Sequence, residues 1–168
     1  DIVFPANLQT IGSYAFRACN LSGNFDIPAT VTTIGNNAFE RCYNISRIIF
    51  KGTTLPDIGW STFDYEPNRS FVVPAGYTFI DESKWKDEYK ANFLVEGKCG
   101  ENAEFVYIAS EKLLRITGTG AIGDYTLNSQ PWTNYKDKIT EIEIKDGITS
   151  IGSHAFGEFS NLNEITIP

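Results

Sequence analysis

The residue types that carry most catalytic chemistry are sparse in this 168-residue sequence. His154 is its single histidine. A zinc site or a hydrolytic triad needs several side chains at matched positions, and a lone histidine does not supply them. His154 also occupies a position that Tyr14 and Asn37 fill in similar segments. We therefore expect His154 to face solvent, and the sequence argues against a hydrolase.

The cysteines are the next candidates for chemistry, and there are three of them. Cys19 and Cys42 occupy equivalent places in neighbouring segments. We expect them to stack in the core as free thiols, because a buried thiol behaves as a small apolar side chain. A disulfide bond between them is the alternative. Cys99 stands apart, and three cysteines leave one unpaired under any oxidising scheme.

Two further groups of residues are better explained without a ligand-binding site. Asp81, Glu82, Asp87 and Glu88 lack the alternating Asp, Asn and Gly pattern of a calcium loop, and they suit the solvated face of a helix. The segment Gly118-Thr119-Gly120 lacks the later glycine and lysine of a phosphate-binding loop. The sequence therefore predicts no catalytic residue, no metal site and no cofactor.

A constant spacing organises most of the chain. Apolar strand endings recur at intervals of 23 residues, and proline follows four of the six. Proline lacks a backbone N–H and ends strand pairing, so it marks the exit of a strand. Units this short cannot bury their own apolar faces, and the fixed period indicates units that stack and share one core. The six endings close at Phe4, Ile27, Phe50, Val73, Ile144 and Ile167.

A hexapeptide that begins with Ile-Gly and ends with Ala-Phe follows these strand endings. The glycine permits a tight bend, and the alanine and phenylalanine are placed to face inward. We predict a tight corner that leads into one helical turn. A degraded copy with Thr62 in place of alanine is shifted by one position, which suggests that it borders an end of the stack. The regular copies span residues 11–16, 34–39 and 151–156, and the degraded copy spans residues 58–63.

Alternation along the strands predicts an open face on the sheet. Side chains of a strand point alternately to its two faces, so Phe25 and Ile27 should enter the core and the residues beside them should point outward. Parallel strands stack these outward residues into ladders. Apolar members of a ladder favour a partner-binding patch, although single exposed aliphatic residues are ordinary. The candidate binding face comprises Val3, Asn24, Asp26, Arg47, Ile49 and Val72.

The middle of the chain interrupts the repeat and is expected to lack the hexapeptide. Aromatic residues recur every four positions over residues 81–93, which predicts a short amphipathic helix that caps the first block. Asp81 or Ser83 is the expected N-cap. Alternation over residues 103–118 predicts a β-hairpin with its turn near Ser110. The hairpin should add to the sheet of the second block or cover its open end.

Composition and charge restrict the classes of function. A chain with 42% apolar residues is long enough for one or two small domains with a sizeable core. Its 14 basic and 21 acidic residues give a net charge of −7 without a basic cluster, which disfavours nucleic-acid binding. We find no run of about 18 apolar residues and no leader segment, so no membrane insertion is expected. Because the chain opens within a strand and has no methionine, we expect a fragment of a longer repeat protein.

These motifs closely resemble the BspA-like leucine-rich repeats, in which a strand ends in Ile-x-Ile-Pro and the corner reads Ile-Gly-x-x-Ala-Phe followed by Cys. The resemblance covers residues 1–73 and 139–168. It implies an α/β repeat fold, a right-handed leucine-rich-repeat solenoid with a parallel sheet, in which a helix and a β-hairpin join two short blocks. The expected boundaries are 1–76 for the first block, 77–97 for the helical cap, 98–138 for the hairpin junction and 139–168 for the start of the second block.

The resemblance also implies a function. Proteins of this family are secreted or displayed on cell surfaces, mostly of bacteria, and act through adhesion or protein contact without catalysis. We therefore expect a non-enzymatic module that binds a host or neighbouring-cell protein through the open sheet face. Two alternatives remain: a carbohydrate-binding module that uses Trp60, Tyr65 or Trp132, and a passive structural spacer.

Overall fold

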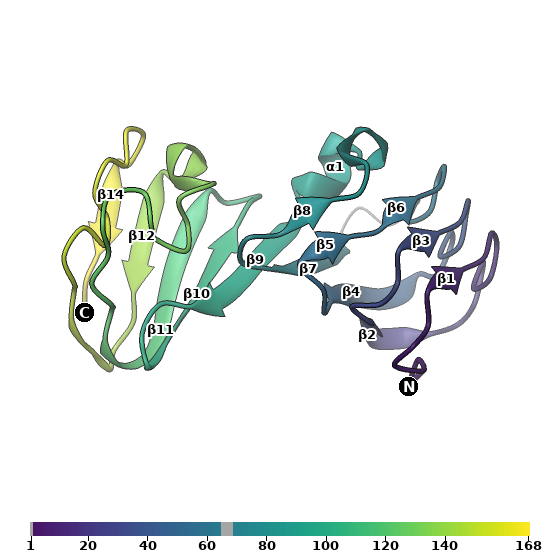
Figure 1. The fold of residues 1–168 in the computed structure, drawn as a ribbon, viewed down its shortest axis with the longest axis horizontal. Coiled ribbons are helices and arrows are strands. Elements are labelled where there is room, and N and C mark those ends of the chain that lie inside the picture. The colour runs from purple at the N-terminus through teal and green to yellow at the C-terminus, as the bar shows by residue number, and fades with distance from the viewer. Residues whose placement is uncertain (1, 65–68) are drawn as a thin grey trace. The chain divides into compact units, whose positions relative to one another are not determined.

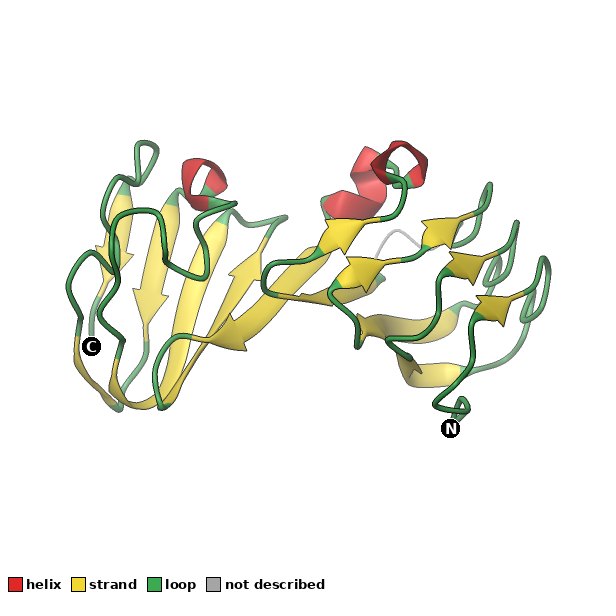
Figure 2. Cartoon of the chain, viewed as in Figure 1, coloured by secondary structure: helices red, strands yellow, loops and turns green. Residues whose placement is uncertain are grey.

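The computed structural model describes residues 2–64 and 69–168. The chain divides into two compact units, Asp1–Phe93 (unit 1) and Leu94–Pro168 (unit 2). Short strands joined by turns make up most of both units, and helical residues are few (Figures 1 and 2). The helical part of the expected α/β class is therefore not confirmed. The observed fold is a β-solenoid of stacked coils.

The main sheet of unit 1 is parallel, as the repeat predicts (Figure 1). Its register pairs Phe25 with Ile48, and Ile48 with Phe71. All three side chains are buried, so the residues at this position of each strand enter the shared core. The strands of this sheet are β2 (Ser22–Ile27), β4 (Asn44–Phe50) and β7 (Ser70–Pro74).

Shorter strands pair on another side of the same coils. Each contains only two residues, and each pair of neighbours is parallel. Ile11, Ile34 and Ile58 follow one another in this layer and are buried, which explains why isoleucine opens the hexapeptide. One small sheet contains β1 (Thr10–Ile11), β3 (Thr33–Ile34) and β6 (Asp57–Ile58), and the other contains β5 (Thr54–Leu55) and β8 (Thr78–Phe79).

The hexapeptide forms a corner made of turns, and the predicted helical turn is wrong. Tyr14, Asn37 and His154 occupy the same position in three copies, and their φ angles lie at 61°, 54° and 56°. Residues in this left-handed region cannot continue a right-handed helix. Backbone bonds instead join neighbouring coils, because the N–H of Tyr14 donates to the carbonyl of Asn36 and the N–H of Asn37 to that of Trp60, each at 2.9 Å.

The third residue of the hexapeptide adds a side-chain bond between coils. The N–H of Asn36 donates to Oγ of Ser13 at 3.2 Å. The N–H of Trp60 donates in the same way to Oδ1 of Asn36 at 2.7 Å. In unit 2 the N–H of Ser153 donates to Oδ1 of Asp124 at 2.6 Å. We call this series the corner ladder; each side chain in it fixes the corner of the following coil.

The closing phenylalanines of the hexapeptides form a column inside unit 1. The rings of Phe16 and Phe39 are stacked with centroids 5.3 Å apart, and those of Phe39 and Phe63 are stacked at 5.7 Å. Such offset aromatic pairs add to the free energy of apolar burial. Phe4 packs edge-on against Phe16 and Phe25, although residues 2–5 do not form the strand predicted for them.

The predicted helix over residues 81–93 is replaced by two short helical segments and a strand. These are η1 (Glu82–Lys84), α1 (Asp87–Lys90) and β9 (Phe93–Lys98). Lys86 lies between the helical segments in an extended conformation, with φ −57° and ψ 148°, which interrupts the helix. Asp81 caps η1 with its carboxylate, as expected. The aromatic residues of the predicted stripe are nevertheless buried: Trp85, Tyr89 and Phe93.

Unit 2 contains the predicted β-hairpin. Its two strands are antiparallel, and the second pairs in parallel with the first strand of the following coil. The hairpin therefore adds to the sheet of this unit, which confirms one of the two expected arrangements. The strands are β10 (Asn102–Ile108) and β11 (Leu113–Ala121), followed by β12 (Glu141–Ile144), β13 (Ile148–Ser150) and β14 (Glu164–Thr166); a short helix, η2, spans Lys136–Lys138.

Residues 122–125 begin with Ile-Gly and form a corner that the sequence interpretation missed. The N–H of Tyr125 donates to the carbonyl of Ser153 at 2.9 Å, which is the same bond between coils as in unit 1. Trp132 stacks on Phe156 with centroids 5.5 Å apart, and so fills the place of a closing phenylalanine. The middle of the chain lacks the Ala-Phe ending of the hexapeptide, as predicted, but it contains a corner with the same bond between coils.

Candidate binding surface of unit 1

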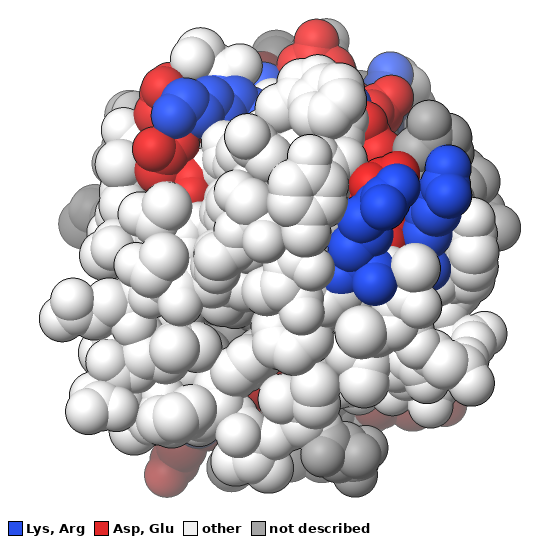
Figure 3. Space-filling view, turned by 90° about the vertical axis from the view of Figure 1, so that its right-hand side faces the viewer, with Lys and Arg blue, Asp and Glu red and all other residues white. Residues whose placement is uncertain are grey.

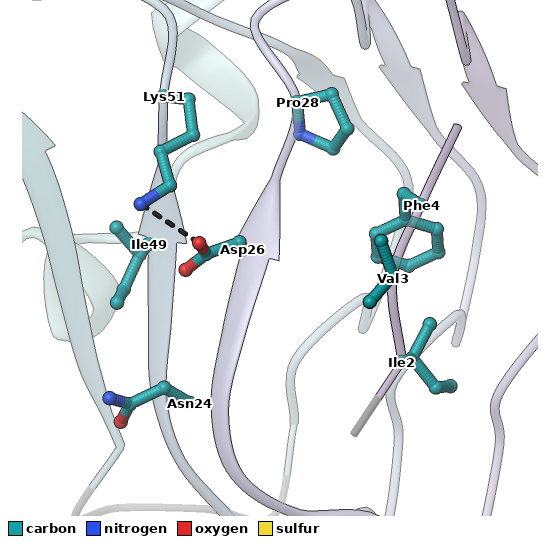
Figure 4. Close-up of a pocket in the computed structure, with 8 residues that line it drawn as sticks. All are labelled: Ile2, Val3, Phe4, Asn24, Asp26, Pro28, Ile49 and Lys51. Atoms are coloured by element: carbon teal, nitrogen blue, oxygen red, sulfur yellow. Dashed lines mark ion pairs between the residues drawn. The ribbon is translucent and has the colours of Figure 1, made fainter. Parts of the chain in front are cut away.

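Four of the six candidate residues lie around one open hollow in unit 1. Val3, Asn24, Asp26 and Ile49 line it, with a volume of about 760 Å³ (Figure 4). Strand β2 supplies Asn24 and Asp26 and strand β4 supplies Ile49, because alternate residues of these strands point away from the core. The remaining lining residues are Ile2, Phe4, Pro28 and Lys51. We call this place the sheet-face hollow.

An ion pair lies within the sheet-face hollow. Nζ of Lys51 is 2.9 Å from Oδ2 of Asp26, and Figure 4 shows this pair next to Ile49. Both charged side chains are about half exposed, so the pair contributes little to the stability of the fold. Its charges are accessible to a partner. Val3 is 90% exposed and Ile49 is partly exposed, so apolar surface borders the charged pair.

Val72 is not part of an open face, and its assignment to the candidate site is corrected. The side chain is only 5% exposed. Phe71, Val72 and Val73 are three consecutive buried residues, so β7 is covered on both faces. Strand alternation predicts which residues share a face, but it does not predict whether that face meets solvent. Arg47 is partly exposed and lies in register between Asn24 and Ser70, beside the hollow.

A second polar cluster on unit 1 was not found from the sequence. Glu40 is almost buried and accepts hydrogen bonds from Nε of Arg17 at 2.7 Å and from Nδ2 of Asn37 at 2.8 Å. The bond from Arg17 holds the pKa of Glu40 below its usual value. Arg17 and Glu40 each follow a closing phenylalanine by one residue. Their equivalent positions in neighbouring repeats could have predicted this ion pair from the sequence.

Asp64 connects the third coil with the capping segment of unit 1. Its carboxylate accepts hydrogen bonds from Lys86, Ser61 and Tyr89, with the Lys86 bond at 2.7 Å and the Ser61 bond at 2.5 Å. Burial raises the pKa of Asp64, but these bonds outweigh it, so the pKa lies below its ordinary value. Burial, and then the hydrogen bond to Asp64, raise the pKa of Tyr89. This cluster is structural, since its groups satisfy one another.

The other candidates for chemistry behave mainly as expected. His154 is exposed, which confirms its expected place. Cys42 and Cys99 are buried and Cys19 is partly exposed; all three are free thiols. Burial, with a smaller contribution from Glu104, raises the pKa of Cys99 to about 11. In the described part of the chain, no group of three or more His, Cys, Asp or Glu side chains is placed to hold a metal ion.

The aromatic residues considered for sugar binding differ in exposure. Trp60 is 70% exposed, so its side chain is accessible to a ligand. Trp132 is fully buried and unavailable to a ligand. Tyr65 lies outside the described residues.

Figure 3 shows a wide uncharged area on one side of the molecule, with basic and acidic side chains next to each other at its edges.

Stacked coils, parallel strands and a recurring corner define a leucine-rich-repeat solenoid. The family model of the BspA type leucine-rich repeat region matches residues 1–93 and 127–168 in 6 copies. The chain belongs to this family. The repeat family indicates a protein-interaction module, and no catalytic family is identified. Residues 94–126, which hold the hairpin and the missed corner, lie outside the matched ranges.

A solved leucine-rich repeat protein from Eubacterium ventriosum is similar to part of the chain. The match has 32% sequence identity and a TM-score of 0.41, and it covers 43% of this chain and 19% of that protein. This chain therefore spans much less than the full length of that protein. No curated protein matches the chain. Among the described residues, no helix has the length and apolar character needed to cross a membrane.

Proposed function

We propose that this chain is a non-enzymatic adhesion or protein-interaction module of a secreted or cell-surface bacterial protein. It binds a host or neighbouring-cell protein through the sheet-face hollow. The family supports the general class, because BspA-type repeats are typically associated with bacterial surfaces. The observation that carries the choice of surface is the meeting of exposed apolar side chains with an accessible ion pair in one hollow.

The chemistry of the hollow defines what a partner must offer. Val3 and Ile49 provide apolar contact area, whose burial is favourable by about 25 cal/mol per Å². Asp26 and Lys51 provide charges of both signs, which affect specificity and the rate of association more than affinity. The partner therefore presents an apolar side chain flanked by polar groups. This combination is typical of protein interfaces with an apolar centre and a polar rim.

The first test replaces Ile49 by aspartate. Binding to a panel of extracellular-matrix and epithelial surface proteins is measured by surface plasmon resonance, after circular dichroism has shown that the variant is folded. The Ile49→Asp variant should lose binding by about tenfold or more, since a charge then occupies the apolar part of the interface. Val72→Asp is unsuitable because Val72 is buried and its loss would unfold the coil.

The matched control is Ile80→Asp, which makes the same change at a side chain that is 50% exposed next to β8. It should bind as the original chain does. Equal loss in both variants would indicate a general charge effect and would reject the sheet-face hollow. Binding that survives Ile49→Asp would reject it as well. Exchanging the residues at positions 26 and 51 tests the charges separately, because it keeps an ion pair but swaps the positions of its positive and negative groups.

A further inference from the structure

Trp60 stands out among the residues of the corner ladder. Its equivalents in the preceding coils are Ser13 and Asn36, whose side-chain oxygens each accept a bond from the next coil. An indole has no acceptor oxygen and cannot continue the ladder. Trp60 is also 70% exposed, whereas Trp85 and Trp132 are buried. The side chain of Trp60 therefore does not perform the structural role of Ser13 and Asn36, which is to accept a hydrogen bond from the next coil.

The backbone that carries Trp60 is held firmly. Its N–H donates to Oδ1 of Asn36 at 2.7 Å, and its carbonyl accepts from the N–H of Asn37 at 2.9 Å. The preceding Gly59 lies so close to the neighbouring coil that a Cβ atom would be 2.4 Å from the amide nitrogen of Asn36. Because the backbone of this corner is already ordered, binding to the exposed indole costs no backbone conformational entropy.

The surroundings of Trp60 are small and polar. Gly59 and Ser61 flank it in the chain, and Asn36 and Asn37 of the preceding coil are hydrogen-bonded to its backbone. A tryptophan at the centre of a protein interface is normally enclosed by other contacts that exclude water. A single indole between glycine, serine and asparagine lacks that apolar surround. It offers instead an aromatic face for stacking beside amide and hydroxyl groups for hydrogen bonds.

We propose that Trp60 is the stacking platform of a carbohydrate-binding site that accepts a neutral pyranose ring. The C–H face of the sugar lies on the indole, and its hydroxyl groups bond to the side chains of Asn36 and Ser13. Tyr14 is a poorer platform because the guanidinium of Arg17 lies 5.8 Å from the centre of its ring. The net charge of −7 disfavours acidic sugars. This site is separate from the sheet-face hollow and does not depend on the proposed function.

The test uses the uneven exposure of the three tryptophans. Because Trp85 and Trp132 are buried, quenching by acrylamide reports mainly on Trp60. The probes are short neutral oligosaccharides of glucose, mannose, galactose and N-acetylglucosamine. A sugar that binds should shift the emission to shorter wavelength and reduce quenching. Isothermal titration calorimetry then gives the affinity of the original chain and of Trp60→Ala, which should be weaker by about tenfold or more.

The control variant is Tyr43→Ala, which removes an aromatic side chain of similar exposure from outside the corner. It should bind the sugar as the original chain does. The proposal is overturned if no probe protects Trp60, or if Trp60→Ala binds as tightly as the original chain. It is also overturned if Trp60→Ala loses binding to a protein ligand while no sugar binds, because Trp60 would then belong to a protein interface.

Discussion

Phe39 is fully buried, and its ring stacks on Phe16 of the preceding coil and on Phe63 of the following coil. Replacing it by alanine removes contacts on both sides and leaves a cavity in the shared core. We expect Phe39→Ala to lower the free energy of unfolding by about 3 to 5 kcal/mol, measured by chemical denaturation. Tyr43→Ala at the surface should change it by only about 0.5 kcal/mol. A loss below about 1 kcal/mol for Phe39→Ala would contradict the shared core.

We expect the stability of unit 1 to depend on pH through Asp64. Its pKa is lower in the folded chain than the value of about 3.9 expected when unfolded. The carboxylate therefore stabilises the fold fully above that value, and this contribution is lost as the pH falls through the lower folded pKa. Asp64→Asn should cost about 1 to 3 kcal/mol near neutral pH and progressively less at acid pH. A cost that is equal at both pH values would exclude this role.

We expect the three cysteine thiols to react with a thiol reagent in a defined order. Three free thiols should react with a thiol reagent in denaturant, since none is in a disulfide bond. In the native chain the partly exposed Cys19 should react first. Cys99 should react slowly at neutral pH because it is buried and its pKa is raised to about 11, which leaves little thiolate. A single reactive thiol in denaturant would show that two cysteines are joined.

The corner of each coil is pressed against the coil before it, and its glycine permits this contact. A Cβ atom on Gly59 would lie 2.4 Å from the backbone nitrogen of Asn36, whereas one on Gly12 would meet nothing within 4 Å. Gly59→Ala should therefore lower the free energy of unfolding by about 1 to 3 kcal/mol through overpacking. Gly12→Ala is the matched control and should be tolerated. Similar thermal midpoints for the two variants would contradict close packing at the corner.

The sequence predicted those elements whose signal is local and repeated. The 23-residue spacing located the parallel strands except at residues 2–5, which form no strand, and alternation located the hairpin. The corner at residues 122–125 was missed because its isoleucine precedes that of the next coil by 29 residues, and extra residues separate it from Trp132. The helix over 81–93 was predicted from a four-residue spacing of aromatic residues. Tertiary packing buries those residues through separate turns and a strand instead.

The candidate site was harder to predict than the fold. Alternation placed Asn24 and Asp26 outward correctly, but it assigned Val72 to an open face that is covered in the structure. Exposure depends on which segments pack over a strand, and one strand's sequence does not contain that information. For the same reason the exposure of Trp60 could not be decided from its residue type.

The charge of the whole chain predicts which partners it avoids. The chain has 14 basic and 21 acidic residues, and many basic groups are in ion pairs, so residues 2–64 and 69–168 present no free cationic stripe that would follow a phosphate backbone. We expect no retardation of DNA or RNA in a gel-shift experiment at neutral pH, even at low salt. A retarded band that disappears with added salt would require a basic surface that this charge distribution does not provide.

The corner ladder always runs in the same direction, from a side chain in one coil to an amide in the next. A coil of the ladder, such as the one that contains Asn36, therefore carries an acceptor for the next coil in its side chain and a donor for the preceding coil in its backbone N–H. A segment of 23 residues copied within the chain would bring both halves of this joint with it. Such an array can lengthen or shorten by whole coils without any new contact having to evolve, and a partner surface can thereby be moved outward or widened in fixed steps.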